Sequence, residues 1–178
     1  MNAAVTGVST GQFKAALGQW PSGVSVVTTR VGSMPAGMTV SAFFSVSLAP
    51  PLVAVCLDRK AATLGLITQS GRFAVNVLSS GQSELSDRFA TRDNEPTRFD
   101  GVALARVEGA GSPLLAGAIV HIDCELRATH DAGDHVLCVG EVGVAVTHPG
   151  MPLIYHSARY HSLSPLSVEA PVAGEPPR

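Results

Sequence analysis

The sequence predicts a mainly β fold that closes toward a β-barrel, not a parallel α/β sheet, and three observations support this. Short runs rich in β-branched residues recur along the chain, whereas only three short segments have a helical pattern. Two long strand candidates, residues 118–129 and 136–147, are joined by residues 131–134, whose composition is that of a turn. Apolar residues make up 46% of the chain and charged residues 15%, which suits a sizeable core with apolar surface left for a subunit interface.

The first expected element is a helix that Thr10 can cap. Its apolar residues Phe13, Ala16, Leu17 and Trp20 fall on one face at i, i+3, i+4 and i+7. Residues 21–23, Pro-Ser-Gly, end it. Further short helices are expected over residues 61–69 and 82–89.

The remaining elements follow from apolar runs and from the turn residues between them. Strands are expected at 24–29, within 35–59 and at 73–78, before the two long candidates, with a turn at 32–35 and a charged loop at 91–100. Residues 1–9 and 164–178 are expected to be disordered, which leaves residues 10–163 as a single domain.

Residues 35–59 carry the most informative pattern, two apolar strands separated by Pro50-Pro51. Thr39, Ser41, Ser45 and Ser47 occupy odd positions of the first strand, so they are expected to form one polar face. A row of hydroxyls beside apolar strands suits a flat ligand with polar edges and a phosphate. The alternative is that these hydroxyls bond to nearby backbone.

Several classes of function are disfavoured by the sequence. The net charge of −2 argues against nucleic acid as a partner, and no apolar run reaches the roughly 18 residues of a membrane helix. The first residues do not have the pattern of a secretory signal, so a cytoplasmic location is the default expectation. Neither common phosphate-binding loop occurs, and the G-x-S-x-G match at residues 7–11 lacks the strand that a nucleophile elbow needs.

The cysteines and histidines do not indicate a metal site. Cys56, Cys124 and Cys138 are expected to be buried thiols, because their number and spacing fit neither a disulfide framework nor a zinc site. His121 is expected to be structural, and Asn76, which interrupts an apolar strand, is expected to bond neighbouring backbone.

Several segments in one order resemble the short flavin reductases that serve two-component flavin-dependent monooxygenases. The matching segments are residues 13–29, 35–59, 70–78, 88–89, 133–135 and 152–155. The resemblance runs from about residue 13 to residue 160.

The resemblance implies a split β-barrel, assembled as a homodimer with flavin near the subunit interface. It implies FMN or FAD as the flavin, NADH or possibly NADPH as the hydride donor, and a separate monooxygenase that receives the reduced flavin. His135, after Gly133-Asp134, would lie over the nicotinamide pocket and position that ring. The implied flavin-binding residues are Met38, Thr39, Val40, Ser41, Ala42, Ser45, Ser47, Cys56, Leu57, Asp58, Arg59, Lys60, Thr63, Arg88, Phe89 and Tyr155.

Each of these assignments has a simpler structural alternative. Arg59 and Lys60 could be a solvated surface pair, Arg88 could complement a helix dipole while Phe89 fills the core, and a lone turn histidine is more often exposed than functional. At the level of the whole protein, the alternative is a non-catalytic flavin-binding or storage module. A third hypothesis, pyridoxine-phosphate oxidation on a related barrel, has less support. That reaction calls for a cluster of basic phosphate ligands, and the 12 Lys and Arg residues are scattered.

Overall fold

A computed structural model describes residues 7–91 and 97–165. The predicted disorder of residues 1–6 and 166–178, and part of the predicted loop, residues 92–96, lie outside the described residues. The serine of the G-x-S-x-G match, Ser9, is the N-cap of the first helix and forms a capping box with Gln12. The cap is therefore Ser9 and not Thr10.

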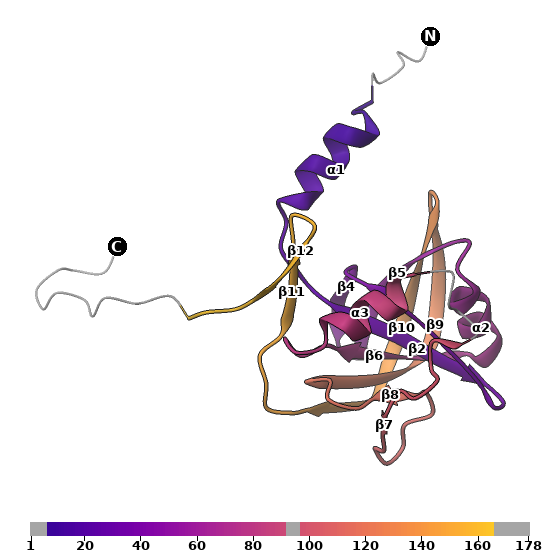
Figure 1. Cartoon of the computed structure of the whole chain (residues 1–178). Coiled ribbons are helices and arrows are strands. Elements are labelled where there is room, and N and C mark those ends of the chain that lie inside the picture. Colours follow the sequence, from indigo (N-terminus) through magenta and orange to yellow (C-terminus); the bar gives the residue numbers. More distant parts are fainter. Residues whose placement is uncertain (1–6, 92–96, 166–178) are drawn as a thin grey trace, which may run out of the picture.

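A strongly curved seven-stranded antiparallel sheet forms the body of the protein (Figure 1). Its order is β3-β2-β6-β9-β10-β5-β4. The strands are β2 (Ser25–Val31), β3 (Met34–Val40), β4 (Phe43–Leu48), β5 (Pro51–Asp58), β6 (Arg72–Val77), β9 (Val120–Ala132) and β10 (His135–Thr147). The prediction of a mainly β fold is confirmed.

Short strands and three helices complete the described part of the chain. Strands β1 (Ser22–Gly23), β11 (Leu153–His156) and β12 (Arg159–Ser162) form a small sheet, and β7 (Leu104–Ala105) pairs with β8 (Leu114–Leu115). The helices are α1 (Thr10–Gly18), α2 (Ala62–Ser70) and α3 (Ser83–Ala90), close to the three predicted segments. None of the helices within the described residues is long and apolar enough to cross a membrane.

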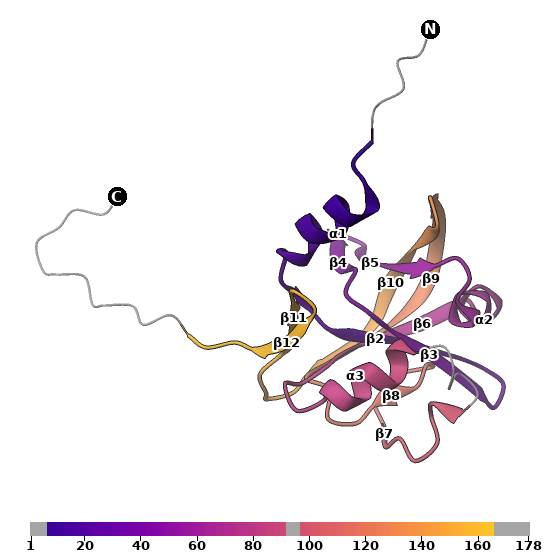
Figure 2. The ribbon, with the colours of Figure 1, turned by 45° about the horizontal axis from the view of Figure 1, so that its top comes forward.

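Strand β2 is buried on both faces because a core lies on each side of it. Val27 belongs to the core inside the curved sheet, together with Ile67 of α2 and Phe73 of β6. Val26, the next residue, points to a second core that includes Phe89 of α3. Figure 2 shows α2 at one end of the curved sheet and α3 across β2 and β3.

Gly140 permits the closest approach inside the sheet. A Cβ at this position would lie 2.6 Å from the Phe73 ring and 2.7 Å from Cys124. A register shift in the pairing of β10 with β9 falls at the same place, between Val139 and Gly140. The long β9–β10 hairpin is strongly curved and extends beyond the sheet body (Figure 1), and a register shift of this kind increases the local bend of a strand.

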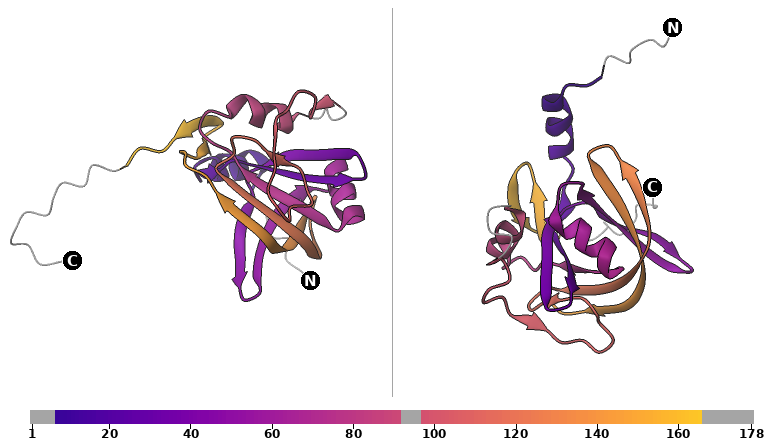
Figure 3. Two further views of the ribbon diagram at one scale, coloured as in Figure 1. Left: turned by 90° about the horizontal axis from the view of Figure 1, so that it is seen from below. Right: turned by 90° about the vertical axis from the view of Figure 1, so that its right-hand side faces the viewer.

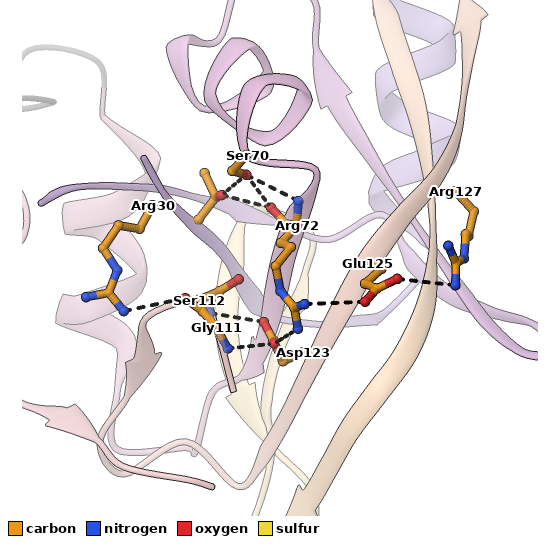
Figure 4. A network of polar contacts seen from close by, with 9 residues as sticks. Arg30, Ser70, Arg72, Gly111, Ser112, Asp123, Glu125 and Arg127 are labelled. Carbon is orange, nitrogen blue, oxygen red and sulfur yellow. Dashed lines mark hydrogen bonds and ion pairs between the residues drawn. The ribbon is translucent and has the colours of Figure 1, made fainter. Parts of the chain in front are cut away.

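A buried carboxylate ties an irregular segment to the sheet (Figure 4). Asp123 on β9 has no exposed side-chain surface and accepts hydrogen bonds from the Arg72 guanidinium at 2.8 Å and from the backbone N–H groups of Gly111 and Ser112 at 2.9 and 3.2 Å. The hydrogen bond with Asp123 raises the pKa of Arg72, so the arginine stays charged. The pair therefore holds the chain before β8 against β6 and β9.

Two predicted structural side chains are confirmed. Asn76 is fully buried, donates to Val26 O and Thr28 Oγ1 at 3.0 Å, and accepts from Leu115 N–H at 2.8 Å. His121 is buried, with one ring nitrogen 2.8 Å from the carbonyl of Leu115.

The three cysteines are free thiols, as expected, but they are not equally buried. Cys124 and Cys138 are buried, and burial raises their pKa values to about 12 and about 11. Cys56 is only half-buried, which corrects the expectation for that residue.

Two apolar surfaces are exposed in the single chain. Helix α1 buries no residue, and Phe13, Leu17 and Trp20 stay 53–73% exposed as the helix stands away from the sheet (Figure 3). Strand β4 is largely exposed as well, with Leu48 at 93%. Both faces are therefore apolar surfaces that the described residues of one copy leave uncovered.

Replacing Asp123 by Ala should lower the free energy of unfolding by about 3–5 kcal/mol, because it leaves the N–H groups of Gly111 and Ser112 without their acceptor and removes the shorter of the two ion pairs of Arg72, which keeps only Glu125 at 3.5 Å. The matched control is Glu141→Gln, which removes an exposed ion pair with Arg127 and should cost less than about 1 kcal/mol. Urea unfolding followed by circular dichroism measures both. Equal costs for the two variants would contradict this account of Asp123.

Candidate active site

Residues 41–42 form a corner at which the chain changes its pairing partner. Val40, the last residue of β3, pairs with Ser25 on β2. Two residues later the N–H of Cys56 on β5 donates to the carbonyl of Ala42 at 3.0 Å, and the ladder continues with Phe43 opposite Val55. The corner therefore joins the two edge strands of the sheet.

This corner corrects the prediction that the four hydroxyls lie on one face of a single strand. The chain turns at Ser41, and a second irregularity in the pairing with β5 falls between Ser45 and Ser47. Thr39 and Ser41 therefore lie on one side of the corner, while Ser45 and Ser47 lie on the exposed β4 beyond it. The predicted turn at 32–35 is also shorter, because β3 begins at Met34.

The corner opens into three hollows that all include Ser41. The strand-end hollow, of about 250 Å³, is lined by Met38, Thr39, Val40, Ser41, Ala42, Cys56, Asp58 and His135. The tyrosine hollow, of about 350 Å³, adds Tyr155, Tyr160, Ser86 and Asp87 on the other side of Thr39 and Val40. The helix hollow, of about 430 Å³, lies between α1 and the β11–β12 turn.

The strand-end hollow brings together eight of the predicted site residues from three parts of the sequence. His135 is opposite Asp58 in the pairing of β10 with β5, which places the histidine beside the end of β5. Its Nδ1 lies 2.7 Å from Oδ1 of Asp134. This hydrogen bond with His135 lowers the pKa of Asp134, so the carboxylate stays charged and orients the imidazole.

The hydroxyls of Thr39 and Ser41 differ in whether they already form a hydrogen bond within the protein. Thr39 Oγ1 donates to the carbonyl of Ser86 at 2.7 Å, so this hydroxyl fastens α3 to β3. Ser41 is exposed, and its hydroxyl has no hydrogen-bond partner among residues 7–91 and 97–165. Of the two, Ser41 is the one available to a ligand.

The segment between β5 and α2 has features that suit an anion. Helix α2 begins at Ala62, and its N-cap residue, Ala61, has no side chain that could accept from the first N–H groups of the helix. Arg59 pairs with Asp131 at 3.0 Å and also reaches the carbonyl of Gly133, which connects this segment to the tip of the β9–β10 hairpin. Lys60 is exposed next to it.

Other predicted residues lie farther from the strand-end hollow. Leu57 and Phe89 are in the core, at 0% and 1% exposure, and Phe89 packs edge-on against Phe99. Arg88 donates to the carbonyls of Thr97 and Asp100. Thr63 is buried and lines a separate hollow beside α2. Their predicted contacts with flavin stay predictions.

Sequence reasoning missed the polar wall of the tyrosine hollow. The Tyr160 hydroxyl lies 2.6 Å from Asp87 Oδ1 and 2.9 Å from Ser86 Oγ, and burial, followed by the Asp87 hydrogen bond, raises its pKa. Tyr155 stacks edge-on against Tyr160 on the neighbouring strand. The recurrence of a Tyr-His pair, at residues 155–156 and again at 160–161, was the available signal for this hairpin.

Strand β11 turns into β12 through a strained two-residue loop. Ser157 and Ala158 both have positive φ, at 49° and 60°, which residues other than glycine rarely adopt. Ser157 donates from its N–H and its hydroxyl to the carbonyl of Gly18. The loop thereby holds the end of α1 beside the helix hollow.

The donor set and shape suit a flavin better than a metal. No group of three or more His, Cys, Asp or Glu side chains within the described residues could hold a metal ion. Neighbouring hollows of this size, which share Ser41 and are lined by small side chains and two tyrosines, suit a flat aromatic ligand. An uncapped helix start close by suits a phosphate.

Comparison with known proteins shows similarity to flavin reductases. The flavin reductase-like domain matches residues 17–164. An NADH-dependent FAD reductase of Streptomyces globisporus is 37% identical over 157 residues, covering 86% of each chain. The reductase component of 4-hydroxyphenylacetate 3-monooxygenase of Thermus thermophilus is 40% identical over 152 residues, covering 85% of this chain and 95% of that protein.

Solved structures of flavin reductases are also similar to this chain. The flavin reductase PheA2 superposes with a TM-score of 0.81 at 37% identity, over 89% of this chain and all of that one. The NADH:FAD oxidoreductase of Streptomyces globisporus C-1027, determined with NAD and FAD fragments, has a TM-score of 0.81 at 36% identity, over 89% of this chain and 94% of that one. The chain belongs to the flavin reductase-like family, and it is a flavin reductase.

We expect Ser41→Val to affect mainly flavin affinity and Thr39→Val to affect mainly stability. Ser41→Val should weaken flavin binding several-fold, because one hydrogen bond is worth about 1 kcal/mol, and should leave the melting temperature unchanged. Thr39→Val should lower stability by about 1 kcal/mol with a smaller effect on affinity, because its hydroxyl bonds to Ser86. Flavin fluorescence titration and thermal unfolding measure the two quantities. Unchanged affinity in Ser41→Val would mean that this hydroxyl does not contact flavin.

Proposed function

We propose that this flavin reductase transfers hydride from NADH to FMN or FAD and supplies the reduced flavin to a separate monooxygenase. The observation that carries the proposal is the strand-end hollow, which gathers Met38–Ala42, Cys56, Asp58 and His135 at one corner of the sheet. The names of relatives support the choice of nicotinamide and of partner. They include an NADH-dependent flavin reductase from a Rhodococcus species, 38% identical over 162 residues, and reductase subunits of flavin-dependent monooxygenases.

In this proposal, the residues of the protein bind the flavin and orient it and the nicotinamide. Bound flavin supplies the hydride acceptor, and no protein acid or base is required for the transfer itself. The small side chains and backbone at residues 38–42 would lie along the flavin ring, with Ser41 donating to one of its polar edges. The start of α2, with Arg59 and Lys60, would receive the phosphate. Tyr155 would limit the ring on the side of the tyrosine hollow.

His135 is proposed to position the nicotinamide. Its ring is held by Asp134, and 44% of its side chain is exposed at the mouth of the hollow. Such a residue can contact a second ligand that arrives over a bound flavin. Because hydride transfer depends on the distance and alignment of two rings, a positioning contact affects the rate more than it affects flavin affinity.

A split barrel and a homodimer belong to the same proposal. The corner at residues 41–42 connects the two edge strands, which favours a closed barrel over an open sheet. The exposed apolar faces of α1 and β4 favour a second copy of the chain that covers them. A dimer of this kind would also bring Ser45 and Ser47 on β4 near a flavin site, where they are predicted.

The alternative function, a flavin-binding or storage module, predicts flavin binding without NADH oxidation. Steady-state NADH oxidation with added FMN, FAD or riboflavin separates the two. The protein should oxidise NADH only when flavin is supplied or retained. Lack of oxidation with every flavin and with both nicotinamides would remove the enzymatic proposal.

Replacement of His135 by Ala should slow reduction of bound flavin by NADH about tenfold or more while flavin affinity stays within about twofold. His130→Ala is the control, because His130 is an exposed histidine on the same hairpin that lines none of the three hollows at Ser41. Stopped-flow absorbance at varied NADH concentration gives the rate and its NADH dependence. Identical kinetics in His135→Ala and the wild type would refute the positioning role.

Leu48→Lys should shift the protein from dimer to monomer, because it places a charge on the exposed end of β4. Met34→Lys is the control, since Met34 is similarly apolar and 60% exposed but lies outside α1 and β4. Sedimentation velocity at micromolar concentration reports the oligomeric state. A wild-type monomer, or an unaltered dimer in Leu48→Lys, would contradict the proposed interface.

A further inference from the structure

A fourth hollow, here named the arginine hollow, lies apart from the flavin site. It has a volume of about 440 Å³ and is formed by the end of β2 and the segment that runs from β7 to β8. It shares no lining residue with the three hollows that meet at Ser41. The residues that carry the inference are Arg30, Leu104, Arg106, Val107, Ser112 and Leu114.

Two guanidinium groups line this hollow without a carboxylate partner among the described residues. Arg30 makes a single long contact, 3.4 Å, to the carbonyl of Gly111, and Arg106 is exposed with no ion pair. Arg59 pairs with Asp131 and Arg127 with Glu141, whereas the exposed Arg159 also has no ion pair among the described residues but lines none of the four hollows. Two uncompensated positive charges at one hollow favour an anion.

A buried hydroxyl in the wall also lacks a partner. Ser112 is 5% exposed, and its Oγ makes no hydrogen bond to the described residues. Buried polar groups are normally satisfied, so such an exception indicates a partner that the fold does not itself supply. Ser112 also lines the hollow, and its hydroxyl, which is enclosed in this structure, would have to turn about the Cα–Cβ bond to donate to an oxygen held there.

The wall is apolar as well as basic, and it is firmly held. Leu104, Val107 and Leu114 supply the apolar surface. Asp123 fixes the backbone N–H groups of residues 111 and 112, and the carbonyl of residue 113 accepts from the Thr28 hydroxyl at 2.5 Å. Figure 4 shows Arg30 and Arg72 approaching this segment from different sides. The backbone of this wall is therefore preformed, and binding does not depend on a rearrangement of the sheet.

We infer that the arginine hollow is a second binding site, for a small organic anion that joins a carboxylate or phosphate to an apolar body. The anionic group lies between Arg30 and Arg106 and accepts from Ser112, and the apolar body covers Leu104 and Val107. This site is independent of flavin binding and of the proposed reductase activity, so failure of either proposal leaves the other standing.

The inference is tested by titrating the full chain with four probes and following its amide NMR signals. The probes are benzoate, phenyl phosphate, inorganic phosphate and neutral benzamide. Benzoate or phenyl phosphate should shift the amides of residues 104–114 saturably, and benzamide and inorganic phosphate should bind at least about tenfold more weakly. Whichever of the two organic anions binds more tightly identifies the anionic group. Arg106→Gln should weaken binding about tenfold, and Arg159→Gln, an exposed arginine outside the hollow, should leave it unchanged.

Three results would overturn the inference. These are the absence of saturable shifts with every anion, equal binding of benzamide or inorganic phosphate, and unchanged affinity in both Arg106→Gln and Arg30→Gln. The two arginines are exposed, so these variants should fold, and retention of the wild-type melting temperature checks that they do.

Discussion

The corner at residues 41–42 is the constraint on which the candidate active site depends. Val40 still pairs with β2, while the carbonyl of Ala42 already accepts from Cys56 on β5. The two residues at the corner, Ser41 and Ala42, are small and exposed. Three hollows meet there because two sheet edges come together around small residues.

The scaffold that holds this corner is stabilised on both faces of β2. One core fills the curved sheet, and the other lies under α3, so the strand that pairs with β3 has little freedom. Thr39 adds a direct hydrogen bond from β3 to α3. The ion pair between the partly exposed Arg72 and the buried Asp123 fixes the segment before β8 to the sheet (Figure 4). A rigid frame of this kind suits an enzyme whose contribution is to align two rings.

Much of the fold could be predicted from the sequence, because long β-branched runs and three short helical patterns are local signals. The corner could not, since neither glycine nor proline marks it and the period-2 pattern continues through Ser41 into β4. The turn predicted at residues 32–35 was too long because proline is common in turns. Pro35 instead lies in β3, which is an edge strand, where proline is tolerated. The grouping of His135 with residues 38–42 came from family resemblance, since no spacing in the sequence shows that these residues meet. Tyr160 was missed because its strand, β12, has only four residues.

The central claim is that flavin binds at the corner, and hydrogen–deuterium exchange with and without FAD tests it most directly. The account predicts slower exchange on FAD binding in peptides that cover residues 36–42 and 56–64, with no change in the β7–β8 segment. Protection confined to other parts of the chain, or no protection at saturating FAD, would contradict it.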